Sequence, residues 1–251
     1  MFRLATPVEK PEGKLKRMAC RTAVNRSVAG TVLASVAVLA SVAVLASMVV
    51  LVTAGPANAA ASVVALWHMD ERSGSVMRDA NRSHNGSLHS VKLGQSGYRG
   101  TAYGFTGSSY VSVPSAGDLN PGSKNITITV RLKTTSTPAD PDWDLVRKGV
   151  YTSTGGEYKM EYQPSGQASC GFKGSNKYSD LIAGPALDNG KWHTVRCVKT
   201  SSTIQLVVDG KTYSKTVTIG SIANSAALVI GSRPGAEFFR GSLDEANIRI
   251  G

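Results

Sequence analysis

Apolar and polar residues alternate with a period of two along most of the chain after residue 61. In the segment ITITVRL at 126–132, the apolar side chains fall on one face and the threonines and the arginine fall on the other. This alternation is typical of β-strands that bury one side. No comparable stretch shows helical periodicity. The pattern predicts strands at 62–69, 101–107, 110–114, 126–134, 157–163, 168–174, 191–200, 203–210, 227–232 and 243–250, with one more short strand at 178–182.

The segment VVDGK at 207–211 predicts a hairpin, because Asp209 and Gly210 supply the two positive-φ positions of a tight turn. Many short strands, turns of this kind and no helices favour an all-β fold. We expect a sandwich of two packed antiparallel sheets.

The first sixty residues have a different character. Residues 1–26 carry seven basic residues and two acids, residues 28–52 carry no charge, and AGPANAAA follows at 54–61. This order predicts a secretory signal peptide cleaved near Ala59. The apolar run is also long enough to span a bilayer, so a retained anchor is the alternative. We therefore expect a leader at 1–59 and one exported domain at 60–251, secreted or at the extracellular surface.

The net charge of +11 overstates the basicity of this domain. Without the leader, 21 basic and 15 acidic residues remain, and the basic residues are scattered along the chain. A nucleic-acid partner is not expected, because such proteins gather their basic residues on one element. Contact with a membrane is expected only if the leader is retained.

Six segments together resemble a known family. In order, they are ALWHMDERSG, DANRSHNGSL, AYGFTGSSYVSVP, GKWHTVRCVKTSSTIQLVVDGK, LVIGSRPG and FFRGSLDEANIRIG. They resemble laminin G-like domains of the concanavalin A-like lectin/glucanase group, in the variety found in secreted actinobacterial proteins, over residues 63–250. The resemblance implies a β-jelly roll of two curved sheets with the first and last strands side by side. It implies less about function, because one fold hosts many functions.

The segment GKWHTVRCVKT at 190–200 brings a histidine close to a cysteine. On one strand, His193 and Cys197 share a face with backbones roughly 13 Å apart. A nucleophile and its base need about 3 Å, so a catalytic pair is disfavoured. We expect His193 to be a hydrogen-bonded strand residue and Trp192 to pack in the core, with a sugar-stacking role for Trp192 as the alternative.

Two cysteines lie outside the leader, which holds the third, Cys20. Paired thiols persist as disulfides in the oxidising compartment that export implies. We therefore predict a disulfide between Cys170 and Cys197. The chain-entropy estimate of its stabilising effect is roughly 3 kcal/mol.

Acidic residues lie near both ends of the domain, at Asp70 after the first strand and at Asp244 within the last. If the terminal strands pair, the carboxylates become neighbours and favour a cation such as Ca²⁺ between them. The resemblance implies the same structural Ca²⁺, with a carbonyl near Gly107 as a further ligand. The alternative is that Asp70 caps a turn and Asp244 pairs with Arg249 or a lysine.

Catalytic carboxylates are harder to find. Glycosidases of this fold use an E-x-D-x-x-E pattern, which the chain lacks. The nearest run, GEYKMEYQ, places Glu157, Lys159 and Glu161 on one face, with the two glutamates about 13 Å apart along the strand. We interpret this face as an exposed, charged one. Tyrosines on the opposite face leave lyase chemistry open.

Sugar rings stack on aromatic side chains, and two aromatics lie in a segment rich in turn residues, Trp143 and Tyr151. Trp143 has an aspartate on either side, and half-buried packing is the alternative for it. We predict an exported, non-catalytic binding module for carbohydrate or cell-surface glycan. The alternatives are a polysaccharide-cleaving enzyme, glycosidase or lyase, on the same fold, and a protein-binding adhesion domain.

Overall fold

The computed structural model describes residues 61–139 and 141–251. The predicted leader at 1–59 lies outside the described residues. Within the described part of the chain, no helix has the length and apolar character needed to cross a membrane.

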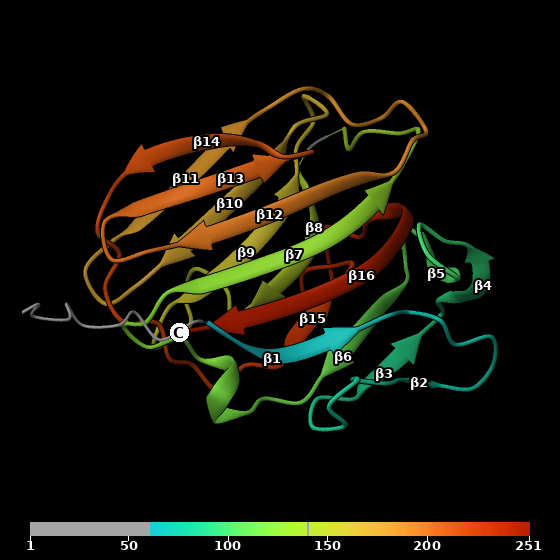
Figure 1. The fold of residues 1–251 in the computed structure, drawn as a ribbon, viewed down its shortest axis with the longest axis horizontal. Helices are drawn as coiled ribbons and strands as arrows, with labels where there is room; N and C mark the ends of the chain where they lie inside the picture. Colours follow the sequence, from blue (N-terminus) through green and yellow to red (C-terminus); the bar gives the residue numbers. More distant parts are fainter. Residues whose placement is uncertain (1–60, 140) are drawn as a thin grey trace, which may run out of the picture. The chain divides into compact units, whose positions relative to one another are not determined.

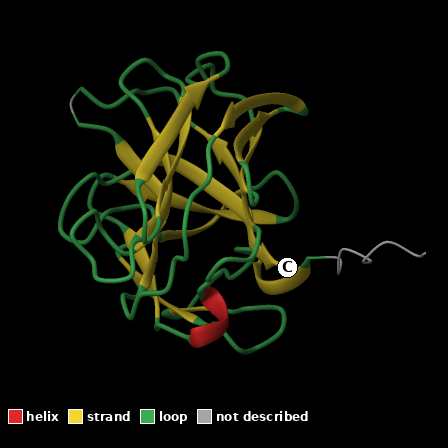
Figure 2. Ribbon diagram, turned by 90° about the vertical axis from the view of Figure 1, so that its left-hand side faces the viewer, coloured by secondary structure: helices red, strands yellow, loops and turns green. Residues whose placement is uncertain are grey.

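The described residues form strands, turns and one short 3-10 helix at Gly117–Leu119, which is the red segment in Figure 2. The strands are β1 (Ser62–Trp67), β2 (Val76–Met77), β3 (Gly86–His89), β4 (Lys92–Ser96), β5 (Thr101–Thr106), β6 (Tyr110–Val113), β7 (Ile126–Lys133), β8 (Trp143–Lys148), β9 (Glu157–Tyr162), β10 (Ala168–Lys173), β11 (Tyr178–Ala183), β12 (His193–Lys199), β13 (Thr203–Val208), β14 (Lys211–Thr216), β15 (Leu228–Ile230) and β16 (Arg240–Ile250).

These strands make two antiparallel sheets. Sheet A has the order β14-β13-β12-β7-β16-β5-β4, with β1 also paired to β16, and it lies in front in Figure 1. Sheet B has the order β11-β10-β9-β8-β15-β6-β3-β2 and lies behind it. The predicted all-β, two-sheet jelly roll is confirmed. So is the expected pairing of the first and last strands, because β1 and β16 are antiparallel neighbours.

The core lies between the two sheets and follows the alternation of the sequence. In β7 the burial pattern alternates strictly, with Ile126, Ile128, Val130 and Leu132 fully buried. From sheet B, residues such as Tyr158 face them. Strict alternation therefore allowed the inward faces of the long strands to be predicted.

The predicted disulfide is present and joins the two sheets. Cys170 on β10 and Cys197 on β12 are bonded, with Cα atoms 5.5 Å apart. The two strands belong to different sheets and face each other across the core. The bond therefore fixes sheet B to sheet A near one end of each.

The hairpin between β13 and β14 is confirmed, with φ values of 48° at Asp209 and 86° at Gly210. The strands that the sequence pattern did not predict are β2, β3, β4, β8 and β14. Strands β2 and β3 are short, and β4 and β14 are mainly polar. In β8 the residues after Trp143 are all buried, so no apolar–polar alternation marks any of these strands in the sequence.

The opening of β12 differs in part from expectation. His193 is a satisfied strand histidine as predicted, because its ring nitrogens lie 2.7 Å from Asp209 Oδ2 and 2.9 Å from Asn189 Oδ1. The prediction for Trp192 is wrong. Its ring is half-buried and lies under the Lys133 ammonium, 5.2 Å from it, and is not in the core beside the disulfide. The strand begins at His193, and His193, Val195 and Cys197 point inward, so Trp192 falls on the outward side.

Candidate functional site

Sheet B carries charged side chains on the face turned away from the core. Strand β9 alternates, so its tyrosines and methionine face inward and Glu157, Lys159 and Glu161 face outward. A register shift in β8 between residues 144 and 146 places Asp144 and Arg147 on this same outer face. Residues of β8 and β9 are thereby set opposite one another, Asp144 across from Glu161 and Arg147 across from Lys159.

One arginine lies at the centre of these groups. The Arg147 guanidinium donates to Asp144 at 2.9 Å, to Glu157 at 2.7 Å and to Glu161 at 3.0 Å. Glu237, from the loop before β16, lies 3.6 Å from the same group. We call these residues, together with Lys159, which pairs with Glu161, the Arg147 cluster. Such multiple charge-assisted bonds hold the side chains in fixed positions.

The cluster is buried, which corrects the expectation of an exposed face. Glu157 is 1% exposed, Glu161 3% and Asp144 0%. Alternation placed these side chains on the correct side of the strand, but it gave no sign that a loop would cover them. The Glu237 carbonyl accepts a hydrogen bond from the Asp144 amide at 2.9 Å, which ties the loop at 231–239 to β8.

Burial alters the proton affinities in the cluster. It raises the pKa of Asp144 well above its ordinary value, in spite of the neighbouring Arg147. It also raises the pKa of Glu157 and of Glu161, partly offset by Arg147 and Lys159. For Arg147 itself, burial disfavours the charge, but the carboxylates of Asp144, Glu161 and Glu157 together outweigh burial and leave the guanidinium pKa raised. Desolvation therefore opposes the charged forms of these groups, and their mutual ion pairs offset part of that cost.

The outer face becomes aromatic and open at one side of the cluster. Tyr151 is 60% exposed and meets the Tyr178 ring edge-on, with ring centroids 5.7 Å apart. The Lys173 ammonium lies 4.2 Å from the Tyr151 ring centroid and the Lys159 ammonium 5.7 Å from that of Tyr178. Gly171 on β10 lies opposite Lys159 and makes room for the lysine side chain. A Cβ at this position would lie 2.7 Å from that side chain.

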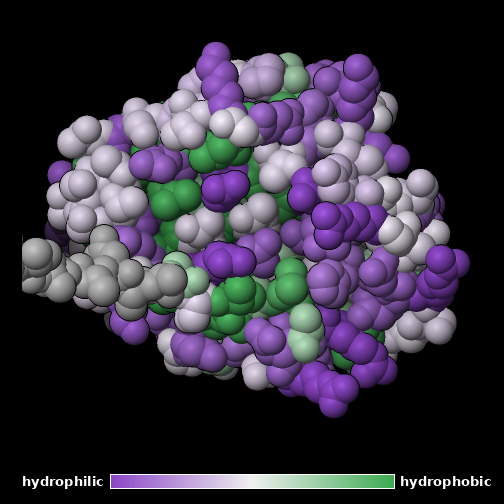
Figure 3. Space-filling model, in the orientation of Figure 1, coloured by the Kyte–Doolittle hydropathy of each residue, from purple (hydrophilic) through white to green (hydrophobic). Residues whose placement is uncertain are grey.

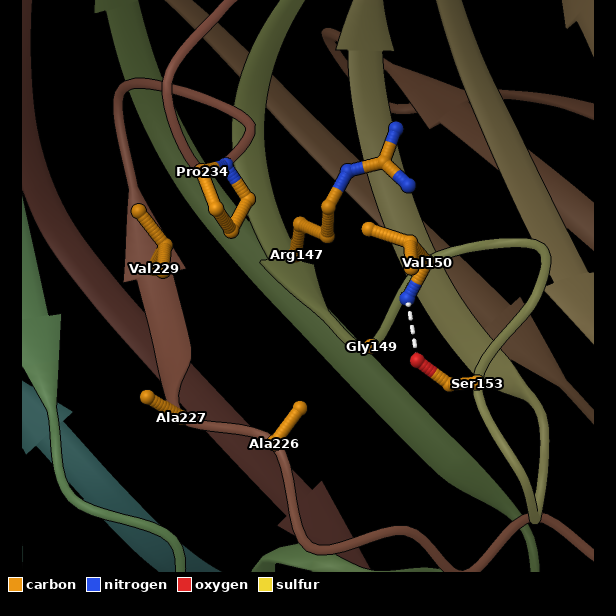
Figure 4. Close-up of a pocket in the computed structure, with 8 residues that line it drawn as sticks. All are labelled: Arg147, Gly149, Val150, Ser153, Ala226, Ala227, Val229 and Pro234. Carbon is orange, nitrogen blue, oxygen red and sulfur yellow. Dashed lines mark hydrogen bonds between the residues drawn. The ribbon is translucent and has the colours of Figure 1, made fainter.

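An apolar pocket of about 230 Å³ lies between the loop that follows β8 and the segment around β15. Figure 4 shows Arg147 among the residues that line it, and the guanidinium of this arginine bonds the carboxylates of the cluster. The loop after β8 closes one side, where the Val150 amide donates to Ser153 Oγ at 2.9 Å. The other lining residues are Gly149, Ala226, Ala227, Val229 and Pro234. Val150 in this wall directly precedes Tyr151, so the loop after β8 contributes both to the pocket and to the aromatic pair.

The two aromatics predicted from the sequence lie in different settings. Tyr151 is open to solvent, as described above. Trp143 is half-buried, with its ring 6.1 Å from that of Tyr162 and 5.9 Å from that of Phe239. Its position matches the packing alternative, and it also lines a smaller pocket with Asp142 and Glu237.

The predicted calcium ligands are only partly brought together. Asp70 accepts from the Thr101 amide at 2.7 Å, and Asp244 accepts from the Tyr98 amide at 2.7 Å, so both carboxylates hold the turn between β4 and β5. Gly107 lies beyond the opposite end of β5, where a Cβ would meet the Arg240 guanidinium. Asp244 pairs with backbone amides and not with the basic side chains proposed as the alternative. Calcium at this position stays a prediction.

No pattern in the sequence predicted a role for Asp144, Arg147 or Glu237. The available signal was the pair of aspartates around Trp143, which is unusual for a half-buried tryptophan. Glu237 gave no signal, because it comes from a loop about 90 residues further along the chain.

Two packed antiparallel sheets with the first and last strands paired define a jelly-roll sandwich. The chain belongs to the concanavalin A-like lectin/glucanases superfamily, whose family model matches residues 105–249. Among curated proteins, no relative matches it.

Several solved structures share the fold. The binding domain of Paraclostridial Mosquitocidal Protein 1 matches with a TM-score of 0.59 and 16% identity, over 74% of this chain and 48% of that one. Domain 4 of AbnA, a GH43 extracellular arabinanase from Geobacillus stearothermophilus, in complex with arabinotriose, gives 0.58 and 15%, over 76% and 93%. The binding domain of Botulinum Neurotoxin DC in complex with SialylT gives 0.55 and 10%, over 75% and 48%. This chain thus spans about half of the two toxin domains. At these identities the likeness establishes the fold.

Proposed function

We propose that this protein is a non-catalytic glycan-binding module that uses the outer face of sheet B. The observation that carries the proposal is the pair of rings of Tyr151 and Tyr178, of which Tyr151 is open to solvent. A lysine ammonium lies over each ring, and the loop that carries Tyr151 also lines an apolar pocket. Aromatic rings supply apolar contact area to the faces of sugar rings. Lys159 and Lys173 supply donors for hydroxyl or carboxylate groups.

The burial and ion pairing of the glutamates on β9 support binding without catalysis. Glycoside hydrolysis needs an acid and a second carboxylate that both reach the scissile bond. Glu157 and Glu161 are buried and both bonded to Arg147, so a sugar would have to displace the guanidinium to reach either. Two of the related structures were solved with arabinotriose or SialylT, which supports testing both plant-type oligosaccharides and sialylated glycans.

The test is a glycan array followed by titration of the best ligand, with the wild type and Tyr151→Ala. Removal of an exposed stacking ring is expected to weaken binding by about tenfold, corresponding to about 1.4 kcal/mol. Tyr98→Ala is the matched control, because Tyr98 is 46% exposed and lies against Arg131 of sheet A. A reducing-sugar assay on the same samples tests for cleavage. Unchanged binding by Tyr151→Ala, or turnover of the ligand, would contradict the proposal.

Export is a second part of the proposal. The disulfide between Cys170 and Cys197 supports an oxidising compartment, where such bonds persist. Expression with the full N-terminal segment should deliver the protein outside the cytoplasm, and N-terminal sequencing should begin near residue 60. A product that stays in the cytoplasm with free thiols would oppose export.

A further inference from the structure

Four carboxylates converge at one edge of the Arg147 cluster. Asp142, Asp144, Glu161 and Glu237 each offer an oxygen, and these oxygens all lie within 4.8 Å of one another. They come from the start of β8, from β9 and from the loop before β16, so the fold itself brings them together.

Two carboxylate oxygens of these residues are buried and have no hydrogen-bond partner. They are Asp144 Oδ1 and Asp142 Oδ1, and the Asp144 side chain is 0% exposed. A carboxylate oxygen removed from water without a partner is costly. Arg147 engages only the other oxygen, Asp144 Oδ2. The unpartnered oxygens therefore indicate a missing positive group on this side of the cluster.

The ion pairs indicate the same. Asp144, Glu161 and Glu237 each pair with Arg147, whereas Asp142 has no ion pair among the described residues. A divalent cation here would pair with Asp142. Hard divalent cations are held by oxygen ligands of this kind.

The spacing allows one calcium ion to reach all four oxygens. Ca²⁺–O distances of 2.3–2.6 Å place opposite ligands about 4.6–5.2 Å apart, and the four oxygens all lie within 4.8 Å of one another. Access is available through a pocket of about 190 Å³ whose lining includes Asp142 and Glu237.

We propose that Asp142, Asp144, Glu161 and Glu237 form a Ca²⁺ site on the outer face of sheet B, separate from the Asp70 and Asp244 pair. Arg147 pairs with Asp144, Glu161 and Glu237, and the ion partners the buried oxygens of Asp142 and Asp144 that have no hydrogen bond. The site joins β8, β9 and the loop at 231–239, so the bound ion stabilises the loop that covers the cluster. The inference does not rest on glycan binding.

The test is Ca²⁺ binding by the purified protein after removal of metals, without any glycan, measured by calorimetric titration. Asp142→Asn and Glu237→Gln should each lower the number of Ca²⁺ ions bound by one, or weaken that ion at least tenfold. Asp142→Asn is the main variant, because its side chain is half-buried and outside the bonds of Arg147. Glu157→Gln is the matched control, since Glu157 bonds Arg147 but is not one of the four ligands. Asp244→Asn reports separately on the other acidic pair.

Terbium provides a second measurement at the same site. Tb³⁺ substitutes for Ca²⁺ as a hard cation, and Trp143 lies between two of the ligands in sequence. Tryptophan-sensitised luminescence should rise on adding Tb³⁺, fall on adding excess Ca²⁺, and be lost in Asp142→Asn. The proposal is overturned if the wild type binds no Ca²⁺, if Asp142→Asn binds it unchanged, or if Glu157→Gln loses it equally. Melting curves in chelator confirm that each variant is folded.

Discussion

The outer faces of the two sheets have similar sequence patterns but different structures. On sheet A, the outward residues of β7 and β12 are mainly threonines and arginines that remain partly or fully exposed, such as Thr129 and Arg196. Figure 3 views this face and shows hydrophilic and hydrophobic side chains interspersed over the sheet. On sheet B, the outward residues of β8 and β9 are buried and joined by ion pairs around Arg147.

The difference comes from what crosses each face. The loop at 231–239 is bonded to β8 and brings Glu237 over the charges of sheet B. On sheet A, seven residues of β7, β12 and β16 line an open groove of about 440 Å³ that contains three arginines and no carboxylate. Charges in water cost little to maintain, whereas buried charges must be paired. The same alternation therefore gives an exposed surface on sheet A, where substitutions cost little stability, and a buried network on sheet B, where each charge needs its partner.

The largest expected effect is from removing the central arginine of sheet B. Arg147→Met leaves Asp144, Glu157 and Glu161 buried without their shared partner. Loss of one side of a buried ion pair destabilises by about 3–5 kcal/mol, and chemical denaturation in metal-free buffer measures this. Arg147→Lys should fall between wild type and Arg147→Met, because it keeps the charge but loses the planar fork. A cost below about 1 kcal/mol for Arg147→Met would remove the contrast between the faces.

That contrast also defines what could be predicted from the sequence. Alternation located β7, β9 and β12 and assigned Glu157 and Glu161 to the correct side of β9. Two cysteines and an export signal were enough to pair Cys170 with Cys197. Burial of a strand's outer face depends on a distant loop, and Glu237 lies about 75 residues beyond β9. No local pattern in the sequence carries that information, so the Arg147 cluster was missed.

The second prediction concerns the bond that fixes the two sheets to each other. The cysteines are separated by 27 positions, for which the chain-entropy estimate is about 3 kcal/mol. The double variant Cys170→Ala/Cys197→Ala should lose about this much stability while keeping its fold. The measurement is the denaturation midpoint of the variant and of the oxidised and reduced wild type. Equal midpoints before and after reduction, or two free thiols in secreted protein, would contradict it.

The third prediction uses a buried lysine on the inner side of β8. Burial lowers the pKa of Lys148 to about 8, from an ordinary value of 10.5. Its ammonium donates to the Asn224 carbonyl at 2.7 Å and to Asn120 Oδ1 at 2.9 Å, which are neutral acceptors. The unfolded chain holds this proton more tightly, so it carries more protons between about pH 8 and pH 10.5. Stability should therefore rise with pH over this window.

The slope from Lys148 is at most about 1.4 kcal/mol per pH unit. Denaturation at pH 8, 9 and 10 measures it, and Lys148→Met should flatten the rise relative to wild type. Lys199→Met is the comparison, because burial also lowers the pKa of Lys199 on the inner side of sheet A. Parallel curves for the wild type and Lys148→Met would show that Lys148 stays charged in the folded protein.

The smallest effect is expected on the outer face of sheet A. Arg196 is exposed in the middle of β12, and the described residues give it no ion pair. Arg196→Gln keeps the length of the side chain and removes only a solvated charge, so the free energy of unfolding should change by less than about 0.5 kcal/mol. The same denaturation assay, run beside Arg147→Met, gives the ratio between the two faces. If Arg196→Gln cost as much as Arg147→Met, the arginines of the groove would have to act as a network with a partner of opposite charge, and sheet A would be a second functional face.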